Sequence, residues 1–349
     1  MTTSSVRNGS QMIEWVSSDG FDQVLSFLGP KDLAPTARVC KAWSQFIDET
    51  NQWKKQCQIQ LGLPPEIDPT DYLPEGSSYK ERLQLVFANI LDERVYERYI
   101  GKVGPVPRIP KEISLKLWNE PDPCDSTKRI GTEYVWMYCP SHIEIDQSDC
   151  FLNKIDDPTD PEAPNLIRRE EGLEGKAFRE IELEAQNTAL KVPVTINNLV
   201  KLFKRPKTGN PSTYRNMWNP IVEQHGNKRM SAGWMCMRRD VIGNDLPFSR
   251  QQALATSRQV VLSELLPRIF FNFTQHVRSP VANVYPDGNN PWTFAHTSTL
   301  TRDLEGHDWP SACGGGVSSG LLVSNLPNFL YPEDIGVAVA LPAEVQVSL

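Results

Sequence analysis

The stretch "VLSFLGPKDLAPTARVCKAWSQF", residues 24–46, carries apolar side chains at helical spacing on both sides of a break. Gly29 and Pro30 end a first helix, and Asp32 is placed to cap a second one. Pro35 falls in the first turn of that second helix, where its missing N–H group has little effect. The apolar residues that share a helix face are Phe21, Val24, Leu25 and Leu28 before the break, and Val39, Trp43, Phe46 and Ile47 after it.

A third helical segment continues this pattern and ends at Gly62, with its apolar face formed by Trp53, Cys57 and Leu61. The sequence therefore predicts three short helices over residues 16–62, preceded by a flexible tail at residues 1–15. A unit of about 45 residues buries too little surface for comfortable independent stability. We expect a binding partner or the rest of the chain to complete its core.

The remainder of the chain mixes helical and strand patterns. Residues 63–129 are predicted to comprise a helix, over 78–101, and a Pro-rich linker, and residues 130–349 one domain. Within that domain, strand patterns occur at 133–140, at 232–243 and in "SGLLVSNL" and "DIGVAVAL", and helical patterns at 168–186, 213–226 and 249–277, the last with a break at Pro267. Because the two patterns do not alternate regularly, we expect an α+β fold.

The composition argues against two classes of partner. The formal net charge is −7, whereas nucleic acids and anionic membrane surfaces are bound through clustered Lys and Arg side chains. The basic stretch "KLFKRPKTG", residues 201–209, carries too few cations for a nucleic-acid groove. The longest apolar run, "IGVAVALPA", is about half of the roughly 20 residues that a membrane span needs. We therefore expect neither nucleic acid nor membrane as a partner.

The cysteines and the N-terminal residues indicate the compartment in which the protein acts. The seven cysteines are odd in number and no two stand at C-x-x-C spacing, so we interpret them as free thiols of a reducing compartment. The first fifteen residues hold no apolar stretch of a secretory signal. We expect a cytoplasmic protein, and the Ser/Thr-rich start is also compatible with secretion into a host cytosol by a signal-less route.

The N-terminal unit resembles an F-box. The resemblance is most specific over "FLGPKDLAPTARVCKAW", residues 27–43, whose Asp-Leu pair and Val-Cys-Lys-x-Trp segment match the family pattern. Further matching positions are Val16, Phe21, Val24, Leu25, Phe27, Leu28, Ile47 and Trp53.

F-box segments bind the Skp adaptor of cullin–RING ubiquitin ligases, and the attached domain recruits the protein to be ubiquitinated. The resemblance thus implies a Skp-type adaptor with its cullin complex as partners, and an unknown target protein bound by residues 130–349. It implies a docking face formed by Val24, Leu25, Phe27, Leu28, Asp32, Leu33, Val39 and Trp43. The alternative is a structural or interaction protein whose N-terminal helices only pack on the C-terminal domain, with no link to ubiquitin.

Residues 130–349 are similar to a C-terminal region that accompanies F-box-like segments in proteins of intracellular bacteria. The similarity lies in "NNLVKLFKRPKTGNPSTYRNMWNPIVEQHG", "WMCMRRDVIGNDLPFSRQQALA" and "GVAVAL". It implies a bacterial effector that acts inside a eukaryotic host. It carries over no catalytic residue, cofactor or metal ligand, so we expect an adaptor without enzyme activity.

One stretch supports an enzyme as the alternative. "HDWPSACGGG" brings His307, Asp308 and Cys313 together in sequence and ends in glycines. A cysteine nucleophile beside backbone N–H donors would suit acyl transfer, including the removal of ubiquitin. Adjacency in sequence does not bring the side chains together, however, and we interpret this stretch as a Gly-rich turn. The loop "YPDGNNPW", residues 285–292, is a candidate for target recognition because loops on rigid scaffolds carry binding.

Overall fold

The structure of the 349-residue chain is a computed structural model. It describes residues 25, 28, 30–39, 41–49, 51–61, 63–73, 76, 78–107, 119–145, 190–204, 206–244, 246–278, 294–314, 321–325 and 335–341. The predicted tail at 1–15, most of the first predicted helix, the charged segment at 168–186 and the loop at 285–292 lie outside these residues.

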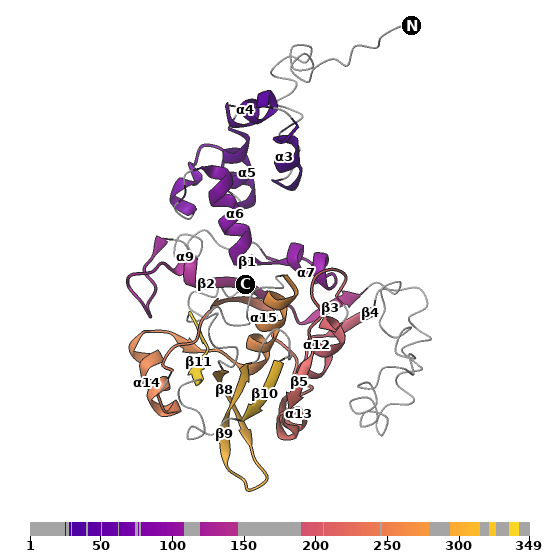
Figure 1. The fold of residues 1–349 in the computed structure, drawn as a ribbon, viewed down its shortest axis with the longest axis vertical. Helices are drawn as coiled ribbons and strands as arrows, with labels where there is room; N and C mark the ends of the chain where they lie inside the picture. Colours follow the sequence, from indigo (N-terminus) through magenta and orange to yellow (C-terminus); the bar gives the residue numbers. More distant parts are fainter. Residues whose placement is uncertain are drawn as a thin grey trace. The chain divides into compact units, whose positions relative to one another are not determined.

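The described residues form two compact units, whose elements are labelled in Figure 1. The first unit comprises the chain up to Asn89 together with 119–121 and 129–132, and the second comprises 90–107, 122–128 and the chain from Glu133 onward. The expected boundary at residue 130 does not coincide with this division. Helices and mixed sheets occur together, which confirms the α+β fold class.

The first unit is helical. Its elements are α3 (Pro30–Thr36), α4 (Lys41–Glu49), α5 (Gln52–Leu61), the 3-10 helix η1 (Pro69–Tyr72) and α6 (Tyr79–Asn89). The second predicted helix is divided into α3 and α4 by a turn at residues 37–39. Asp32 does not cap this helix, because α3 begins earlier, at Pro30, where a proline ring pre-sets the helical φ angle.

Residues beyond the predicted helical unit complete the packing around α5. The Gln58 amide donates hydrogen bonds to the carbonyl oxygens of Pro65, at 2.8 Å, and Ile67, at 2.7 Å. The Lys54 ammonium pairs with the Asp68 carboxylate at 2.8 Å. The segment at 63–73, which precedes the helix predicted at 78–101, is therefore bonded to α5 and belongs to the first unit.

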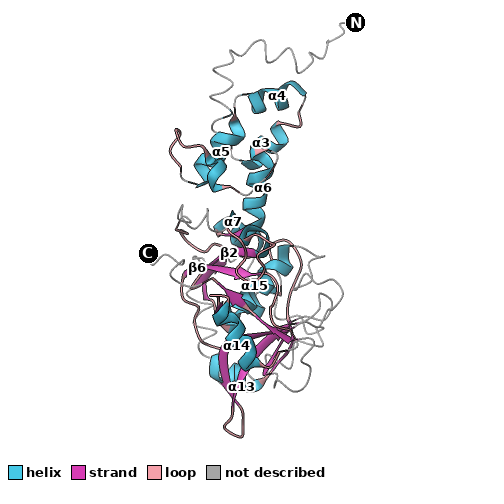
Figure 2. Cartoon of the chain, turned by 90° about the vertical axis from the view of Figure 1, so that its left-hand side faces the viewer, coloured by secondary structure: helices cyan, strands magenta, loops and turns pink. Residues whose placement is uncertain are grey.

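The second unit contains two five-stranded sheets and a two-stranded one. The first sheet has the order β1-β2-β6-β12-β7 and comprises β1 (Ile90–Leu91), β2 (Tyr134–Cys139), β6 (Gly233–Arg238), β12 (Val339–Ala340) and β7 (Val261–Leu262). The second has the order β11-β8-β9-β10-β5 and comprises β11 (Ile335–Val337), β8 (Phe294–Arg302), β9 (Asp308–Gly314), β10 (Leu321–Asn325) and β5 (Tyr214–Met217). The third pairs β3 (His142–Ile145) with β4 (Leu190–Pro193). Figure 2 shows β2 and β6 side by side, as their antiparallel pairing requires.

Helix α15 (Leu265–Arg278) forms the centre of the second unit. Its apolar residues are buried around most of the helix, which is typical of a core helix. The ring of Phe270 lies 5.3 Å from that of Tyr96 and 5.9 Å from that of Phe203. Buried Arg268 donates to the backbone oxygen of Arg238 at 2.8 Å, so its charged group has a polar partner. The other helices of the second unit are α7 (Glu93–Tyr99), α12 (Ile196–Phe203), α13 (Asn219–His225) and α14 (Phe248–Ser257). Of α9 (Ile130–Glu133), residues 130–132 belong to the first unit.

The chain passes from one five-stranded sheet to the other at Ala338. Before it, β11 pairs with β8; after it, β12 lies between β6 and β7. Ala338 is fully buried, its N–H donates to the carbonyl oxygen of His296 at 2.9 Å, and its own carbonyl accepts from the N–H of Ser263 at 2.9 Å. One short segment, residues 335–341, therefore belongs to both sheets.

Two predicted helices are wrong in the same way, because a short strand forms part of each. The predicted helix at 78–101 is α6, β1 and α7, and the carboxylate of Asp92 starts α7 by accepting from the N–H of Arg94 at 3.1 Å. The predicted helix at 213–226 is β5 followed by α13, whose first turn contains Pro220. In both cases apolar residues fit helical spacing, but pairing with a distant strand determines the backbone.

The predicted helix at 249–277 is also interrupted. It comprises α14, the strand β7 and α15, and the break lies at residues 258–264. Pro267 causes no break, because it lies in the first turn of α15, where no intrahelical N–H bond is needed. The strands predicted at 133–140, 232–243 and in the two C-terminal stretches correspond to β2, β6, β10 and the pair β11 and β12.

The five cysteines that the structure describes carry free thiols. In the described part of the chain, every helix is too short or too polar to pass through a bilayer.

Candidate docking site

The first residues of the predicted docking face lie in the chain before α3, and one of them is hydrogen-bonded to α5. Leu25 is buried in the first unit, and the carbonyl oxygen of Leu28 accepts a hydrogen bond from the Gln56 amide at 2.7 Å. Gln56 is itself buried, so this bond satisfies a polar group that has left water. Leu28 is therefore held against α5 through a polar contact, and Leu25 before it is part of the core of the unit.

Helix α3 buries one side and exposes the other. Leu33 is fully buried, whereas Asp32 beside it is exposed. The hydroxyl of Thr36 donates to the carbonyl oxygen of Asp32 at 2.6 Å, so the two polar residues of this exposed side are joined by a local bond. Leu33 thus contributes to the stability of the unit, and Asp32 is available at its surface.

Val39 is the most exposed of the apolar docking residues that the structure describes, with 62% of its surface accessible. It lies in the turn between α3 and α4. Three backbone bonds hold this turn, from the N–H groups of residues 37, 38 and 39 to the carbonyl oxygens of Leu33, Pro35 and Thr36 at 2.8, 2.9 and 3.1 Å. The exposed valine therefore projects from a turn with a defined backbone.

On the apolar face of helix α4, the burial of the side chains differs from one turn to the next. Ile47 is fully buried and Trp43, one turn earlier, is half-buried. Residues four apart lie on the same side of a helix, so the indole ring extends the buried face toward the surface. The neighbouring Phe46 is also half-buried.

Helix α5 adds an exposed apolar residue that is not among the eight predicted docking residues. Ile59 is 55% exposed, although its neighbours Cys57 and Gln58 are buried. It lies off the predicted face of Trp53, Cys57 and Leu61, and a large apolar residue outside the helix stripe was the signal that could have identified it.

Two titratable groups of this unit have shifted pKa values, for different reasons. Burial raises the pKa of the Cys57 thiol to about 12, and its Sγ atom lies 3.6 Å from the carbonyl oxygen of Tyr79 on α6. The hydrogen bond from Lys54 lowers the pKa of the Asp68 carboxyl, with further help from Thr70. Neither group changes charge near neutral pH, so neither makes docking pH-sensitive.

Six of the eight predicted docking residues are described by the structure, and they fall into three groups. Leu25 and Leu33 are core residues of the unit, Leu28 and Trp43 are half-buried, and Asp32 and Val39 are exposed. Val24 and Phe27 lie outside the described residues. Among those described, the surface offered to a partner consists of Val39 and Asp32 with the accessible edges of Trp43 and Leu28.

The structure separates the residues of the alternative enzyme site. Cys313 is fully buried in β9 and its Sγ atom accepts from the Asn272 amide at 3.6 Å. His307 lies before the first residue of that strand and its side chain is 63% exposed. A strand rises by about 3.3 Å per residue, so His307 and Cys313 lie at opposite ends of β9. The predicted turn at Cys313 is wrong, because strand pairing of Cys313 with Ala295 and Val323 extends β9 through this residue.

A family model described as F-box-like matches residues 22–59. Two curated proteins are also similar to part of the chain, both named F-box/SPRY domain-containing protein 1. The protein from Culex quinquefasciatus is 38% identical over 66 residues, and the one from Aedes aegypti is 36% identical over 66 residues. Each match covers 18% of this chain and 25% of the relative, so the chain spans about a quarter of the length of these relatives. No solved structure matches the chain.

The matched span contains α3, α4 and most of α5, and it confirms the F-box-like resemblance of the N-terminal helices. The association of F-box-like segments with ubiquitin-ligase adaptors is the general functional indication that follows. The comparisons give no support to a bacterial effector, which remains a prediction from the sequence.

Proposed function

We propose that this chain is a ubiquitin-ligase adaptor. Its N-terminal helices dock on a Skp-type subunit of a cullin–RING complex, and its second unit binds the protein to be ubiquitinated. The observation that carries the proposal is the exposure of Val39 on a fixed turn within the F-box-like segment. A large apolar side chain held at the surface is suited to burial against a partner.

Two further proposals accompany this role. The chain acts without catalytic activity of its own, with Cys313 as a core residue, and it acts in the cytosol of a eukaryotic cell, where Skp-type subunits are found. For a bacterial source this location requires delivery by a signal-less secretion route. The alternative of an interaction protein unconnected with ubiquitin predicts no Skp binding at all.

The test is a calorimetric titration of the full chain with a recombinant Skp-type subunit. Val39→Asp should weaken binding at least about tenfold, because it removes apolar burial and places a carboxylate in the interface. The matched control is Val261→Asp, which changes a 42% exposed valine of the second unit in the same way. Equal affinity of the Val39→Asp and Val261→Asp variants, with both folds intact, would reject the docking site.

A further inference from the structure

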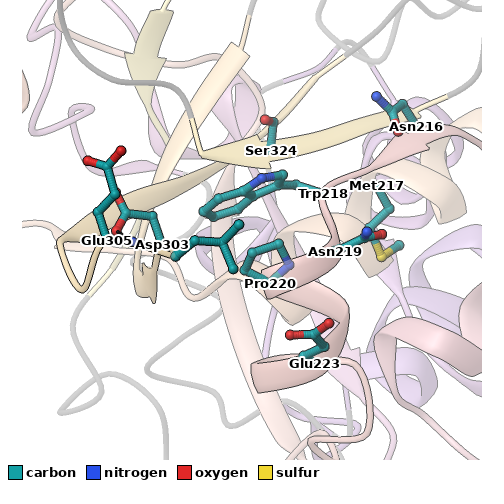
Figure 3. A pocket seen from close by; sticks show the side chains of 10 residues that line it. Asn216, Met217, Trp218, Asn219, Pro220, Glu223, Asp303, Glu305 and Ser324 are labelled. Carbon is teal, nitrogen blue, oxygen red and sulfur yellow. Dashed lines mark hydrogen bonds between the residues drawn. The ribbon is translucent and has the colours of Figure 1, made fainter.

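The second unit carries a groove between α13 and the tip of the β8–β9 hairpin (Figure 3). Two adjoining hollows of about 550 and about 410 Å³ share four lining residues, Pro220, Glu223, Asp303 and Leu304, and therefore form one continuous depression. We call it the α13–hairpin groove. Its size accommodates a few amino-acid side chains and is too small for a folded domain.

The base of the groove is apolar and is fixed in place. Trp218 precedes α13 and is half-buried, and its indole lies between Ser324 and Pro220 in Figure 3. The N–H of Trp218 donates to the carbonyl oxygen of Val323 on β10 at 2.9 Å. The backbone that carries the indole is thus held by the sheet.

The two walls are bonded to each other. The Gln224 side chain of α13 donates to the carbonyl oxygen of Arg302 at 2.7 Å and accepts from the N–H of the same residue at 3.0 Å. The His225 ring Nε2 lies 3.0 Å from the carbonyl oxygen of Leu300 on β8. Because α13 and the hairpin are joined in this way, the groove is preorganised, which reduces the entropic cost of binding.

The hairpin tip exposes a large apolar side chain above this base. Leu304 is 95% exposed and lines both hollows. The tip itself is held by Asp303, whose carboxylate accepts from the N–H groups of Glu305 and His307 at 2.9 and 2.8 Å and from the Trp309 indole at 2.8 Å. Leu304 therefore projects from a structured turn, where it is available to a ligand.

The rim of the groove is acidic. Glu223, Asp303 and Glu305 line it, and the cation at its edge, Arg302, is paired with Asp308 at 3.0 Å. Glu223 makes no hydrogen bond or ion pair among the described residues. The adjacent His307 ring lies 3.7 Å from Glu305 and adds positive charge only when protonated. A ligand in the groove thus meets an apolar base flanked by carboxylates that lack a fixed cation.

We propose that the α13–hairpin groove binds a short basic and apolar segment of the target protein. An apolar side chain packs on Trp218 and Leu304, and flanking Lys or Arg side chains pair with Glu223 and Glu305. The identification of the segment as part of a target rests on the proposed adaptor function. The peptide chemistry itself rests on the charge of the rim and the apolar base.

The experiment uses the full chain labelled with 5-fluorotryptophan and followed by fluorine NMR. The signal of Trp218 is assigned with Trp218→Phe, and the probe is the peptide acetyl-Gly-Arg-Leu-Arg-Gly-amide. The Trp218 signal should shift in a saturable way with this peptide. Peptides with Glu in place of both Arg residues, or Ser in place of Leu, should bind at least about fivefold more weakly, since exposed charge pairs and apolar contacts each contribute modestly.

Variants separate the two parts of the site. Glu223→Gln with Glu305→Gln should weaken the peptide about fivefold and reduce the dependence of its affinity on salt. Leu304→Ser should weaken it about fivefold while leaving the salt dependence unchanged. The matched control is Glu264→Gln, which neutralises an exposed carboxylate of the second unit that does not line the groove.

Three results would overturn the proposal. The first is an unshifted Trp218 signal at millimolar peptide, and the second is equal binding of the Arg and Glu peptides. The third is a Trp218 shift that depends on protein concentration without peptide, which would make a second copy of the chain the occupant. A titration of the same variants with the Skp-type subunit distinguishes failure of the groove proposal from failure of the adaptor proposal. The groove variants should bind the Skp-type subunit with unchanged affinity.

Discussion

Leu33 and Val39 are both apolar residues of the F-box-like segment, yet they act at different places. Leu33 is fully buried within the first unit, and Val39 is 62% exposed in the following turn. A loss of Skp binding therefore has two different meanings for the two residues. At Leu33 it would report unfolding of the unit, and at Val39 it would report loss of a contact.

Leu33→Asp should unfold the first unit, because a carboxylate buried without a partner costs several kcal/mol. Hydrogen exchange of α3, α4 and α5 in the full chain should rise toward the unprotected rate, while α15 of the second unit remains protected. Val39→Asp serves as the control and should leave exchange of both units unchanged. Retained protection of α3 in the Leu33→Asp chain would contradict the burial of Leu33.

Acid should destabilise the second unit through His276. Burial lowers the pKa of this side chain, its ring Nε2 lies 3.1 Å from the carbonyl oxygen of Pro211, and its buried Nδ1 has no hydrogen-bond partner among the described residues. The unfolded chain therefore binds the proton more readily. The contribution to stability is complete above the unfolded pKa of about 6.5 and is lost as the pH falls below it, with a slope of at most about 1.4 kcal/mol per pH unit.

This pH dependence can be measured by urea unfolding followed through hydrogen exchange of α15. His276→Gln keeps an amide donor near the position of Nε2 but cannot titrate, so its free energy of unfolding should change less between pH about 7.5 and about 5.5. His307→Gln is the matched control, since this histidine of the second unit has a 63% exposed side chain, whereas His276 is buried. An unchanged acid slope in His276→Gln would exclude this residue as the cause.

For single residues, the sequence predicts helix faces but does not predict which side chains on them are buried. Helical spacing correctly placed Trp43 and Ile47 on one face of a helix, but it also placed Val39 there, which lies in the turn before α4, and spacing alone cannot tell which of the three is covered. That distinction depends on α5 and on the segment after it. Trp218 and Leu304 could not be brought together from sequence, because the groove they line forms only where β8, β9 and α13 meet.

At the scale of elements, the predictions failed where a short strand depends on a distant partner. The run at Tyr214 fits a helix face, but it forms β5 because it pairs with β10. By contrast, β2 and β6 could be predicted, since each has a run of large apolar residues long enough to indicate a buried strand.

The second unit should require residues 90–107. The hydroxyl of Tyr96, which is fully buried in α7, donates to the carbonyl oxygen of Tyr138 at 2.7 Å, and β1 pairs with β2. A chain of residues 130–349 lacks these contacts and should melt well below residues 90–349, because loss of a buried aromatic residue costs about 3–5 kcal/mol. Calorimetry of both fragments gives the comparison.

Tyr96→Phe in the full chain isolates one part of that effect. It removes the hydroxyl bond and keeps the ring, so the loss should be only about 1–3 kcal/mol. Equal melting temperatures for fragments 90–349 and 130–349 would show that α7 and β1 add nothing to the fold.

At the scale of the whole molecule, the two units should unfold in separate transitions. The first unit is the smaller one, and small cores bury a lower fraction of their surface. Buried thiols report each unit, since Cys57 lies in the first and Cys236 and Cys313 lie in the second, all fully buried. Pulsed alkylation across a urea series, read by mass spectrometry, should label Cys57 at a lower concentration than the other two.

The labelling has an internal control in Cys124, which is only half-buried in the native chain and should react before any transition. Simultaneous labelling of Cys57, Cys236 and Cys313 would mean that the units unfold as one cooperative body.

The change of sheet at Ala338 has a consequence for synthesis on the ribosome. Residues 335–341 supply an edge strand to one sheet and an inner strand to the other. A nascent chain can form α3 to α6 early, but its β6 and β7 have to wait for β12 until this segment has emerged from the exit tunnel. During that interval two strand edges and the apolar residues around α15 are open to chaperones and to other nascent chains. A stop before residue 335 should therefore increase aggregation far more than a stop after residue 341, because only the longer product contains β11 and β12.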